Sequence, residues 1–485
     1  MKNSMKNIAK NFFSNAFYQV FSIIFPLLTM PYIARILGAE KIGIYNYTYS
    51  IAIYFALVVK LGVDHYGNRS IAKVGENIER RSILFFEIFG IQLFSGIVCI
   101  LLYLIYVFNF AQQYQEIALL QVFLIVSYML DINWFFYGIQ QFNIVIVRNI
   151  LVKLSSLIFI FLLVKKQDDL WLYTLIMNGS AIAGFLITWF QVKNYIFYKK
   201  IKLSEVSKHF KPSAILFIPI VSATIYTSFT SVFLGNLSSI KDVGFYNAGS
   251  QVLSMPKGII AALGTVMLPQ MSAIYEKKDS KAKATKYLNY SVIFALFLSI
   301  AFAFGILGVS KDFVPLFYGK DFNASILVLN GLALYLPFYA LGNVIRTQYL
   351  IPQSKDRPFV VSVLLGALTS IIVNLLLVKP LGLLGATIAT FLSESVLAVY
   401  QIFAARKEIS FKIFINPFIV FFISGIIMMV TLNSLPLEGL SIFVRLLAKI
   451  GIGVILYLII TLLYFRYSKN EIIRSSREWI IKRVR

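Results

Sequence analysis

The sequence is poor in the residues that build disulfides, metal clusters and water-soluble surfaces. It contains one cysteine, Cys99, and two histidines, His65 and His209. A single cysteine excludes an intramolecular disulfide and a cysteine metal cluster, and two histidines argue against a histidine metal site. Charged residues make up 14% of the 485 positions, against about 25% in an ordinary soluble domain. So few charges cannot cover the surface of a water-soluble protein of this size.

The chain is instead rich in hydrophobic residues and in positive charge. Hydrophobic residues account for 59% of the sequence, the mean hydropathy is +0.79 and the formal net charge is +24. Nucleic-acid binding would explain the charge but not the hydrophobicity. A multi-pass membrane protein explains both, provided that the basic residues collect in loops on one side of the membrane.

Apolar runs of about twenty residues, long enough to cross ~30 Å of hydrocarbon as a helix, recur along the whole chain. Hydrocarbon offers no partner for free backbone groups, so these spans should be helical and the fold all-α. We predict about fourteen spans, at 12–36, 42–63, 83–108, 115–139, 143–164, 170–192, 212–236, 242–271, 287–309, 323–350, 358–378, 383–403, 414–433 and 441–465.

The basic residues sort the loops into two sets. With the N-terminus inside, the inner segments hold thirty Lys and Arg, the outer loops seven and the spans eight. This bias predicts that both termini are cytoplasmic. The basic tail after residue 465 either lies on anionic headgroups or is solvated and only sets topology. The longest outer loop, 310–322, is too short for a catalytic domain, and no ATP-binding P-loop sequence occurs, so we expect a transporter rather than an enzyme.

A short repeat divides the chain into related halves. Ile42-Gly43-Ile44-Tyr45-Asn46 recurs as Val243-Gly244-Phe245-Tyr246-Asn247, and a Leu-Gly pair precedes each copy. Six spans separate the copies, so both run in the same direction and predict two parallel six-helix halves. The predicted regions are an N-terminal lobe (1–205), a C-terminal lobe (206–410), two extra helices (411–465) and a cytoplasmic tail (466–485).

Apart from Asp242, the first residue of the predicted span 242–271, twelve charged residues fall inside the predicted spans. The basic ones are Arg35, Lys60, Arg148, Lys153, Lys257, Arg346, Arg445 and Lys449, and the acidic ones are Glu87, Glu116, Asp131 and Glu394. A base facing lipid at a helix centre costs ~2.5–3.5 kcal/mol, so each should reach a headgroup or a wet cavity. Snorkelling is the default for Arg35, Lys60, Arg346 and Arg445, which lie near span ends, whereas Lys153 and Lys257 are predicted to face a cavity. The excess of bases favours an anionic substrate, while an exporter of organic cations should show the reverse balance.

Asp131 begins the sequence Asp131-Ile132-Asn133-Trp134-Phe135-Phe136-Tyr137-Gly138. Its aromatic run, Trp134 to Tyr137, is predicted to form an interfacial belt. The short turn at 140–142 makes the fourth and fifth spans antiparallel neighbours, which places Asp131 and Lys153 at similar depth. A salt bridge between them and a substrate or ion site are both consistent with this placement.

Several stretches together carry a family resemblance. They are Pro31 to Gly38 followed by Ile42 to Tyr45, Asp131 to Phe136, Arg148-Asn149 with Lys153, and Leu268-Pro269-Gln270-Met271-Ser272. In this order the sequence resembles the bacterial polysaccharide repeat-unit flippases (Wzx-type) of the multidrug/oligosaccharidyl-lipid/polysaccharide (MOP) exporter superfamily. The resemblance implies a V-shaped, MATE-like fold of two six-helix lobes plus two helices around a cationic cavity, working by alternating access.

The resemblance also implies a substrate and a location. The substrate would be an oligosaccharide on undecaprenyl pyrophosphate, flipped across the bacterial cytoplasmic membrane for O-antigen or capsule, with a polymerase and other assembly proteins as partners. Candidate pyrophosphate-binding residues are Arg35, Arg148 and Lys153, on matching stretches, and Lys257 and Arg346, from their in-span charge alone. Candidate residues for coupling to H⁺ or Na⁺ are Asp131, Glu87 and Glu394. No other cofactor is implied.

Two alternative functions stay open at this stage. One is an ion-coupled exporter of organic cations from the same superfamily. The other is a membrane glycosyltransferase or polymerase that uses the same lipid-linked sugars, against which the short outer loops argue.

Overall fold

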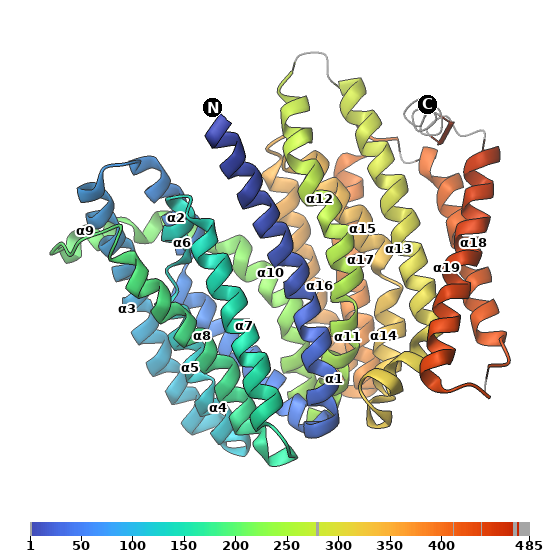
Figure 1. Ribbon diagram of the computed structural model, residues 1–485, viewed down its shortest axis with the longest axis horizontal. Helices are drawn as coiled ribbons and strands as arrows, with labels where there is room; N and C mark the ends of the chain where they lie inside the picture. Colours follow the sequence, from blue (N-terminus) through green and yellow to red (C-terminus); the bar gives the residue numbers. More distant parts are fainter. Residues whose placement is uncertain (1, 278–280, 411, 438, 469–472, 475–485) are drawn as a thin grey trace. The chain divides into compact units, whose positions relative to one another are not determined.

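The fold is helical throughout the part of the chain that the structure describes. The computed structural model describes residues 2–277, 281–410, 412–437, 439–468 and 473–474, and every regular element among them is a helix (Figure 1). Eleven helices in this part are long and apolar enough to cross a membrane, or twelve if one bent pair counts as a span. The protein is therefore a multi-pass membrane protein. Residues 469–472 and 475–485 of the predicted basic tail lie outside the described residues.

The chain divides into two compact units, Met1–Gly235 (unit 1) and Asn236–Arg485 (unit 2). The α-helices that begin in unit 1 are α1 (Lys2–Lys60), α2 (Val63–Val74), α3 (Ile78–Phe110), α4 (Gln115–Leu120), α5 (Val122–Leu130), α6 (Asn133–Gly138), α7 (Phe142–Leu163), α8 (Leu170–Val192), α9 (Leu203–Lys208) and α10 (Phe210–Leu237). Short 3₁₀ turns, Gln112–Tyr114 and Gln167–Asp169, precede α4 and α8.

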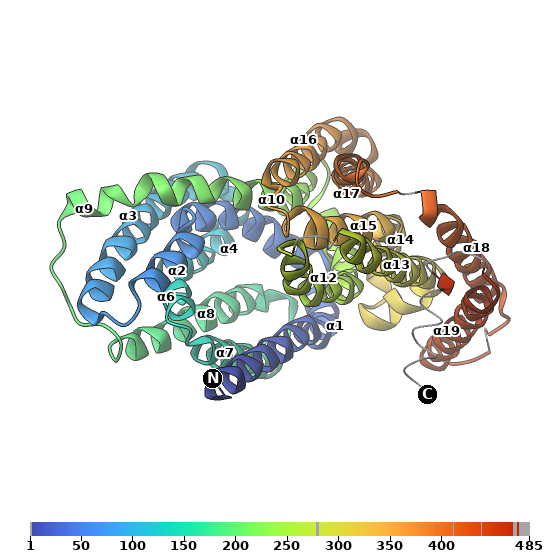
Figure 2. The same ribbon diagram turned by 90° about the horizontal axis from the view of Figure 1, so that it is seen from above.

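Unit 2 is built on long helices, several of which pack against the next helix in the chain. Its α-helices are α11 (Ile240–Val252), α12 (Ser254–Tyr275), α13 (Lys281–Phe317), α14 (Ser325–Ala333), α15 (Leu336–Ile345), α16 (Asp356–Leu381), α17 (Leu383–Ala405), α18 (Lys412–Ser434) and α19 (Ile442–Tyr467). A 3₁₀ turn, Lys320–Phe322, precedes α14, and a π-helical turn, Arg346–Leu350, extends α15. Figure 2 shows α16 beside α17 and α18 beside α19, and α13 contacts both α18 and α19.

Helices coincide with all the predicted apolar runs, but several of the predicted boundaries differ. The first two predicted spans form one helix, α1, with a kink at Gly38, whose φ of 75° favours glycine. The predicted span 115–139 is broken into α4, α5 and α6. The number fourteen stays a prediction, because Phe25–Val74 counts as one candidate span although it contains the kink.

Two prolines that lie inside predicted spans stand in the first turns of helices. The predicted span 242–271 breaks between α11 and α12, and Pro256 follows two residues after the start of α12. The predicted span 323–350 bends by 44° between α14 and α15, and Pro337 is the second residue of α15. Proline is tolerated in a first helical turn because the backbone N–H that it lacks has no partner there.

The two copies of the sequence repeat adopt the same local conformation. Asn46 Nδ2 donates to the carbonyl oxygen of Ile42 over 2.9 Å, and Asn247 Nδ2 donates to that of Val243 over 2.9 Å. In each copy the asparagine side chain thus donates to the backbone carbonyl one turn earlier in its own helix. The five-residue match therefore has a structural counterpart in each unit.

The aromatic residues after Asp131 form part of the interior of unit 1. Trp134, Phe135 and Phe136 have no exposed surface, and the ring of Phe85 lies 5.5 Å from that of Trp134 and 5.1 Å from that of Phe135. The predicted interfacial belt is therefore wrong for these three residues, because the chain break before α6 turns them inward against α2. At Gly67 of α2, an added Cβ would lie only 2.5 Å from the indole of Trp134.

Candidate functional site

A buried polar network lies in unit 1 where α5 ends and α6 begins. We call Lys60, Asp131, Asn133 and Arg148 the unit 1 network. Lys60 is 4% exposed, and its Nζ lies 2.9 Å from Asp131 Oδ2 and 2.8 Å from Asp64 Oδ1. The other carboxylate oxygen of Asp131 accepts a hydrogen bond of 2.9 Å from the backbone N–H of Asn133. The carboxylate thus connects the end of α1 to the start of α6.

Arg148 joins the same network from α7. Its Nη2 donates to Asn133 Oδ1 over 3.1 Å and to the side-chain oxygen of Asn149. The guanidinium carbon lies 4.4 Å from the centre of the Phe185 ring, a distance typical of a cation–π contact. An amide oxygen is neutral, so these hydrogen bonds orient the guanidinium without cancelling its charge.

The structure changes the predicted ion pairing of Asp131. Asp131 pairs with Lys60 rather than with Lys153, so of the two alternatives left open for Asp131 and Lys153 the structure contradicts the salt bridge. Lys153 Nζ instead lies 5.6 Å from the centre of the Phe25 ring on α1. Arg148 and Lys153 are five residues apart, which puts them on different faces of α7. Lys60 does not snorkel as predicted, because two carboxylates bind it inside the protein.

Glu87 belongs to a different cluster of unit 1. Its Oε2 lies 3.0 Å from His209 Nε2, and His209 Nδ1 lies 2.6 Å from the hydroxyl of Tyr66. Arg35 is exposed, three residues before the kink of α1. Among the candidates of unit 1, the contacts therefore bring together Asp131 and Arg148 and place Glu87 elsewhere.

Three candidates of unit 2 gather around one tyrosine. We call Lys257, Tyr339, Arg346 and Glu394 the unit 2 cluster. Lys257 Nζ lies 3.9 Å from Glu394 Oε1 and 5.1 Å from the centre of the Tyr339 ring. Tyr339 interacts electrostatically with Lys257, Arg346 and Glu394. A separation of 3.9 Å is too long for a hydrogen bond, so the ammonium and the carboxylate form a loose ion pair.

The two partners of this ion pair differ in exposure. The side chain of Lys257 is 31% exposed, whereas that of Glu394 is 5% exposed. The ammonium group can therefore reach a ligand in solvent or in a cavity, while the carboxylate stays inside the protein. Arg346 starts the π-helical turn, a feature often found at functional sites.

An asparagine holds Arg346 as another holds Arg148. Arg346 Nη2 donates to Asn343 Oδ1 over 2.7 Å, and Asn343 Nδ2 donates to the carbonyl of Ile260 on α12 over 3.2 Å. Lys and Arg both bind phosphate, Arg through a planar fork of donors. Each unit thus presents a cation on an amide support that suits phosphate oxygens. Asn343 lies three residues before Arg346, so the i, i+3 spacing on a helix could have predicted the hydrogen bond between them.

Sequence reasoning missed a second charged group in unit 2. Asp312 is 5% exposed and binds Arg445 Nη2 and Lys449 Nζ, each over 2.7 Å. Asp312 had been assigned to the outer loop 310–322, but α13 continues to Phe317. The predicted snorkelling of Arg445 is therefore wrong. This group fastens α19 to α13 and has the character of a structural contact.

The sequence matches one protein family and is similar to several known proteins. The family model described as "Polysaccharide biosynthesis protein" matches residues 8–275. A "Putative O-antigen transporter" of Shigella dysenteriae is 22% identical over 393 residues, covering 79% of this chain and 96% of the relative. A "Probable low-salt glycan biosynthesis flippase Agl15" of Haloferax volcanii is 25% identical over 292 residues, covering 59% and 61%.

A solved structure shares the fold. The inward closed conformation of the lipid II flippase MurJ aligns with a TM-score of 0.75 at 17% identity, covering 94% of this chain and 99% of that one. At this identity the likeness establishes the fold and leaves the substrate to be argued from the residues.

Proposed function

Since the chain belongs to the polysaccharide biosynthesis protein family, we propose that it is a flippase for lipid-linked oligosaccharide repeat units. Its substrate is an oligosaccharide on undecaprenyl pyrophosphate, and its product is the same molecule on the other leaflet, ready for surface polysaccharide assembly. One observation carries the proposal: each unit holds basic groups inside membrane-spanning helices, next to amides and aromatic rings. Such groups can bind a phosphate that must cross hydrocarbon. The protein therefore acts as a transporter and not as an enzyme.

The proposal assigns roles to the charged residues of both units. The pyrophosphate contacts Arg35, Arg148, Lys153, Lys257 and Arg346 at successive stages, and an H⁺ or Na⁺ gradient acts through Asp131, Glu87 or Glu394. Glu394 suits this role because it lies beside Lys257, so a cation that neutralises its charge changes what the lysine binds. The proposal retains fourteen crossings, two pseudo-symmetric six-helix lobes with two extra helices, and alternating access. It also retains a polymerase as partner.

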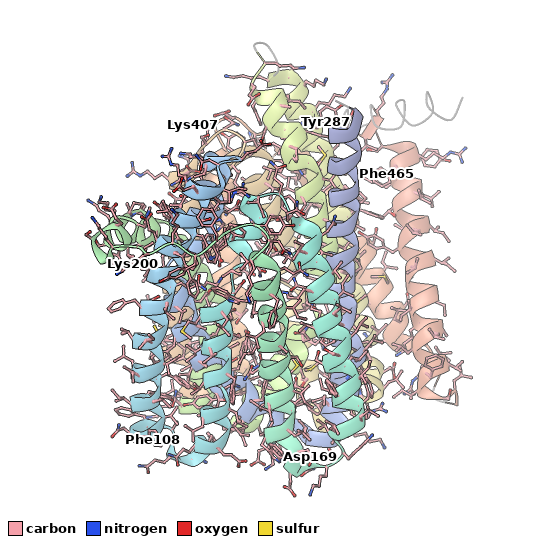
Figure 3. All side chains as sticks on the ribbon, turned by 60° about the vertical axis from the view of Figure 1, so that its left-hand side comes forward. Phe108, Asp169, Lys200, Tyr287, Lys407 and Phe465 are labelled. Carbon is pink, nitrogen blue, oxygen red and sulfur yellow. The ribbon has the colours of Figure 1, made fainter. Side chains whose placement is uncertain are left out.

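The orientation in the cytoplasmic membrane is testable with single cysteines. In unit 1, Lys200 lies at the opposite end of the helices from Phe108 and Asp169 (Figure 3). Because the connections at the Lys200 end are rich in lysine, we propose that this end is cytoplasmic. A cysteine at Gln113, next to the outer end of α3, should react with a membrane-impermeant maleimide on intact cells, whereas one at Lys200 should react only after permeabilisation.

The background of this labelling experiment is low, since the native Cys99 is buried. Cysteine at Lys407, which follows α17 in unit 2, provides a second cytoplasmic position. Labelling of Lys200→Cys and Lys407→Cys from outside, with Gln113→Cys protected, would reverse the proposed orientation.

Depletion of the protein in its native host tests the function. The flippase proposal predicts that lipid-linked oligosaccharide accumulates on the inner leaflet while surface polysaccharide disappears. An unchanged surface polymer with no accumulated lipid intermediate would contradict it.

A further inference from the structure

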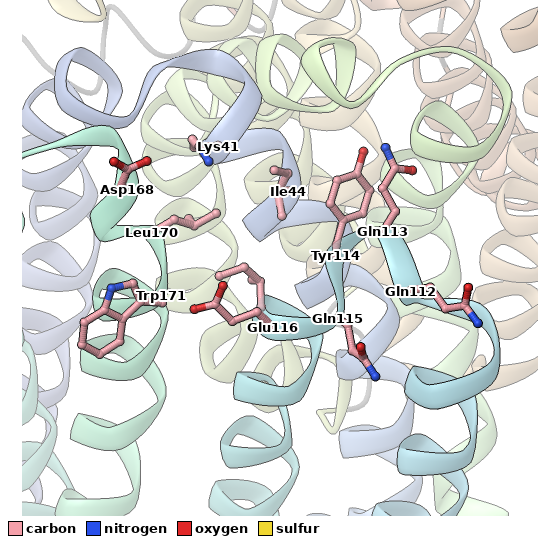
Figure 4. Close-up of a pocket in the computed structure, with 11 residues that line it drawn as sticks. Lys41, Ile44, Gln112, Gln113, Tyr114, Gln115, Glu116, Asp168, Leu170 and Trp171 are labelled. Carbon is pink, nitrogen blue, oxygen red and sulfur yellow. The ribbon is translucent and has the colours of Figure 1, made fainter.

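Unit 1 contains an open pocket that the proposed transport mechanism does not use. It has a volume of about 470 Å³, within the range of about 300–1,000 Å³ typical of small-ligand sites. Its lining comes from α1 just after the Gly38 kink, from the start of α4 with the turn before it, and from the start of α8 with the turn before it. In Figure 4, Asp168, Leu170 and Trp171 lie on one side and Gln112, Gln113 and Tyr114 on the other, with Lys41 and Ile44 between them.

The polar side chains of this pocket are available to a ligand. Within the described residues, no hydrogen bond or ion pair occupies the side chains of Lys41, Gln112, Gln113, Gln115, Glu116, Asp168 and Trp171. The adjacent Asp169 behaves differently, because its carboxylate accepts the backbone N–H groups of Lys165 and Lys166 over 2.8 and 3.0 Å. Asp169 thus forms the turn, whereas Asp168 faces the pocket.

The lining combines groups that recognise sugars. Ile44, Ile117 and Leu170 are buried and supply the apolar part of the lining, while Trp171 is 44% exposed. An aromatic face suits the C–H face of a pyranose, since its apolar body packs and its edge tolerates water. Carboxylates accept hydroxyl hydrogens, and the amides of three glutamines both donate and accept. The combination fits adjacent hydroxyl groups on a ring.

The charge of the lining selects among sugars and against phosphate. Two carboxylates, Glu116 and Asp168, oppose one ammonium group, Lys41. A phosphate or a uronic acid brought into this pocket would meet a net negative charge, whereas a neutral sugar would not. The pocket therefore differs in chemistry from the unit 1 network and the unit 2 cluster, whose basic groups suit the pyrophosphate.

We infer that this pocket binds a neutral pyranose of the oligosaccharide headgroup. The inference rests on the proposed function, and on the proposed orientation, in which the segments 37–41, 109–114 and 165–169 are outer loops. On this arrangement the headgroup is captured at the outer face while the basic groups hold the pyrophosphate. Binding of the sugar in this pocket favours transport from the inner to the outer leaflet, because the sugar leaves the basic groups for a site whose negative charge excludes the pyrophosphate.

Saturation-transfer NMR with lactose tests the pocket directly. The full chain is placed in lipid nanodiscs free of glycoside detergent, because such detergents carry a sugar of their own. The wild type should give saturation-transfer signals from lactose in the millimolar range, and weaker signals from glucuronate. Trp171→Ala and Asp168→Ala should each reduce the lactose signal at least fivefold. Asp168→Ala guards against a folding defect, because Asp168 is exposed and, among the described residues, its carboxylate has no hydrogen bond or ion pair.

Two matched controls lie away from the pocket. Phe190→Ala removes another exposed aromatic from α8, and Glu276→Gln neutralises an exposed carboxylate of unit 2. Both should leave the lactose signal unchanged. Three results would overturn the proposed sugar site: no lactose signal from the wild type, lactose signals from Trp171→Ala and Asp168→Ala as strong as that of the wild type, or a stronger signal from glucuronate than from lactose. Flipping of lipid-linked oligosaccharide by the same preparations separates the two proposals, since it can persist when the pocket proposal fails.

Discussion

Replacing Lys257 with glutamine is expected to weaken the binding of a lipid pyrophosphate about tenfold or more, whereas Glu394→Gln is expected to strengthen it. The ammonium of Lys257 is partly exposed and 3.9 Å from the buried carboxylate, so it can exchange this partner for a phosphate. A hydrogen bond to a charged group contributes about 1.5–3 kcal/mol, which corresponds to roughly 10–150-fold in affinity. Removing the carboxylate removes the competitor and should also slow release.

Native mass spectrometry with undecaprenyl pyrophosphate measures both affinities. The two affinities are expected to change in opposite directions. This distinguishes the prediction from damage to the fold, which would weaken binding in both variants. Lys379→Gln, which neutralises an exposed lysine at the end of α16, is the matched control and should bind as the wild type does. An affinity that is unchanged in Lys257→Gln, or reduced in Glu394→Gln, would contradict the assigned roles.

Asp312→Asn is expected to destabilise unit 2 by about 3–5 kcal/mol. The substitution leaves Lys449 and Arg445 without the carboxylate that each binds over 2.7 Å, and Lys449 is only 8% exposed. Breaking a buried ion pair from one side costs more than removing the whole group, because a buried charge remains without compensation. Adding Lys449→Met and Arg445→Met to Asp312→Asn should therefore recover much of the loss.

Thermal unfolding in detergent, followed by intrinsic fluorescence, ranks these variants. Asp321→Asn provides the control, since Asp321 lies in the same predicted outer loop but is exposed. A melting temperature of Asp312→Asn equal to that of Asp321→Asn would show that the three-residue group contributes nothing to the docking of α19.

Local patterns predicted the helices but not their breaks. The apolar runs located helical segments because a span needs only length and hydrophobicity. The residues between α5 and α6 include no proline or glycine, so the sequence did not predict a break there. It is stabilised from α3, where Gln92 Nε2 donates to the carbonyls of Tyr128, Met129 and Asp131 over 2.8–3.0 Å. Gln92 lies 36 or more residues away from these carbonyls. Local sequence patterns therefore could not predict that it binds the carbonyls that the break leaves without a helical partner.

The same distance limits what could be predicted of the charged sites. Counting charges within spans singled out Lys257, Arg346 and Glu394, which the structure does bring around Tyr339. It did not reveal that Asp131 pairs with Lys60, because 71 residues separate them. Roles in substrate binding and ion coupling follow from neither contact and stay predictions.

The measurement that tests the central claim most directly is transport by the purified protein in liposomes. A lipid-pyrophosphate-linked oligosaccharide is placed in both leaflets, and the fraction that a membrane-impermeant glycosidase can cleave is followed with time. The account predicts that nearly all of it becomes cleavable with the wild type, that the same fraction is approached more slowly with Lys257→Gln, and that about half is cleavable in protein-free liposomes. A cleavable fraction of about half with the folded wild type under an imposed H⁺ or Na⁺ gradient would contradict the account.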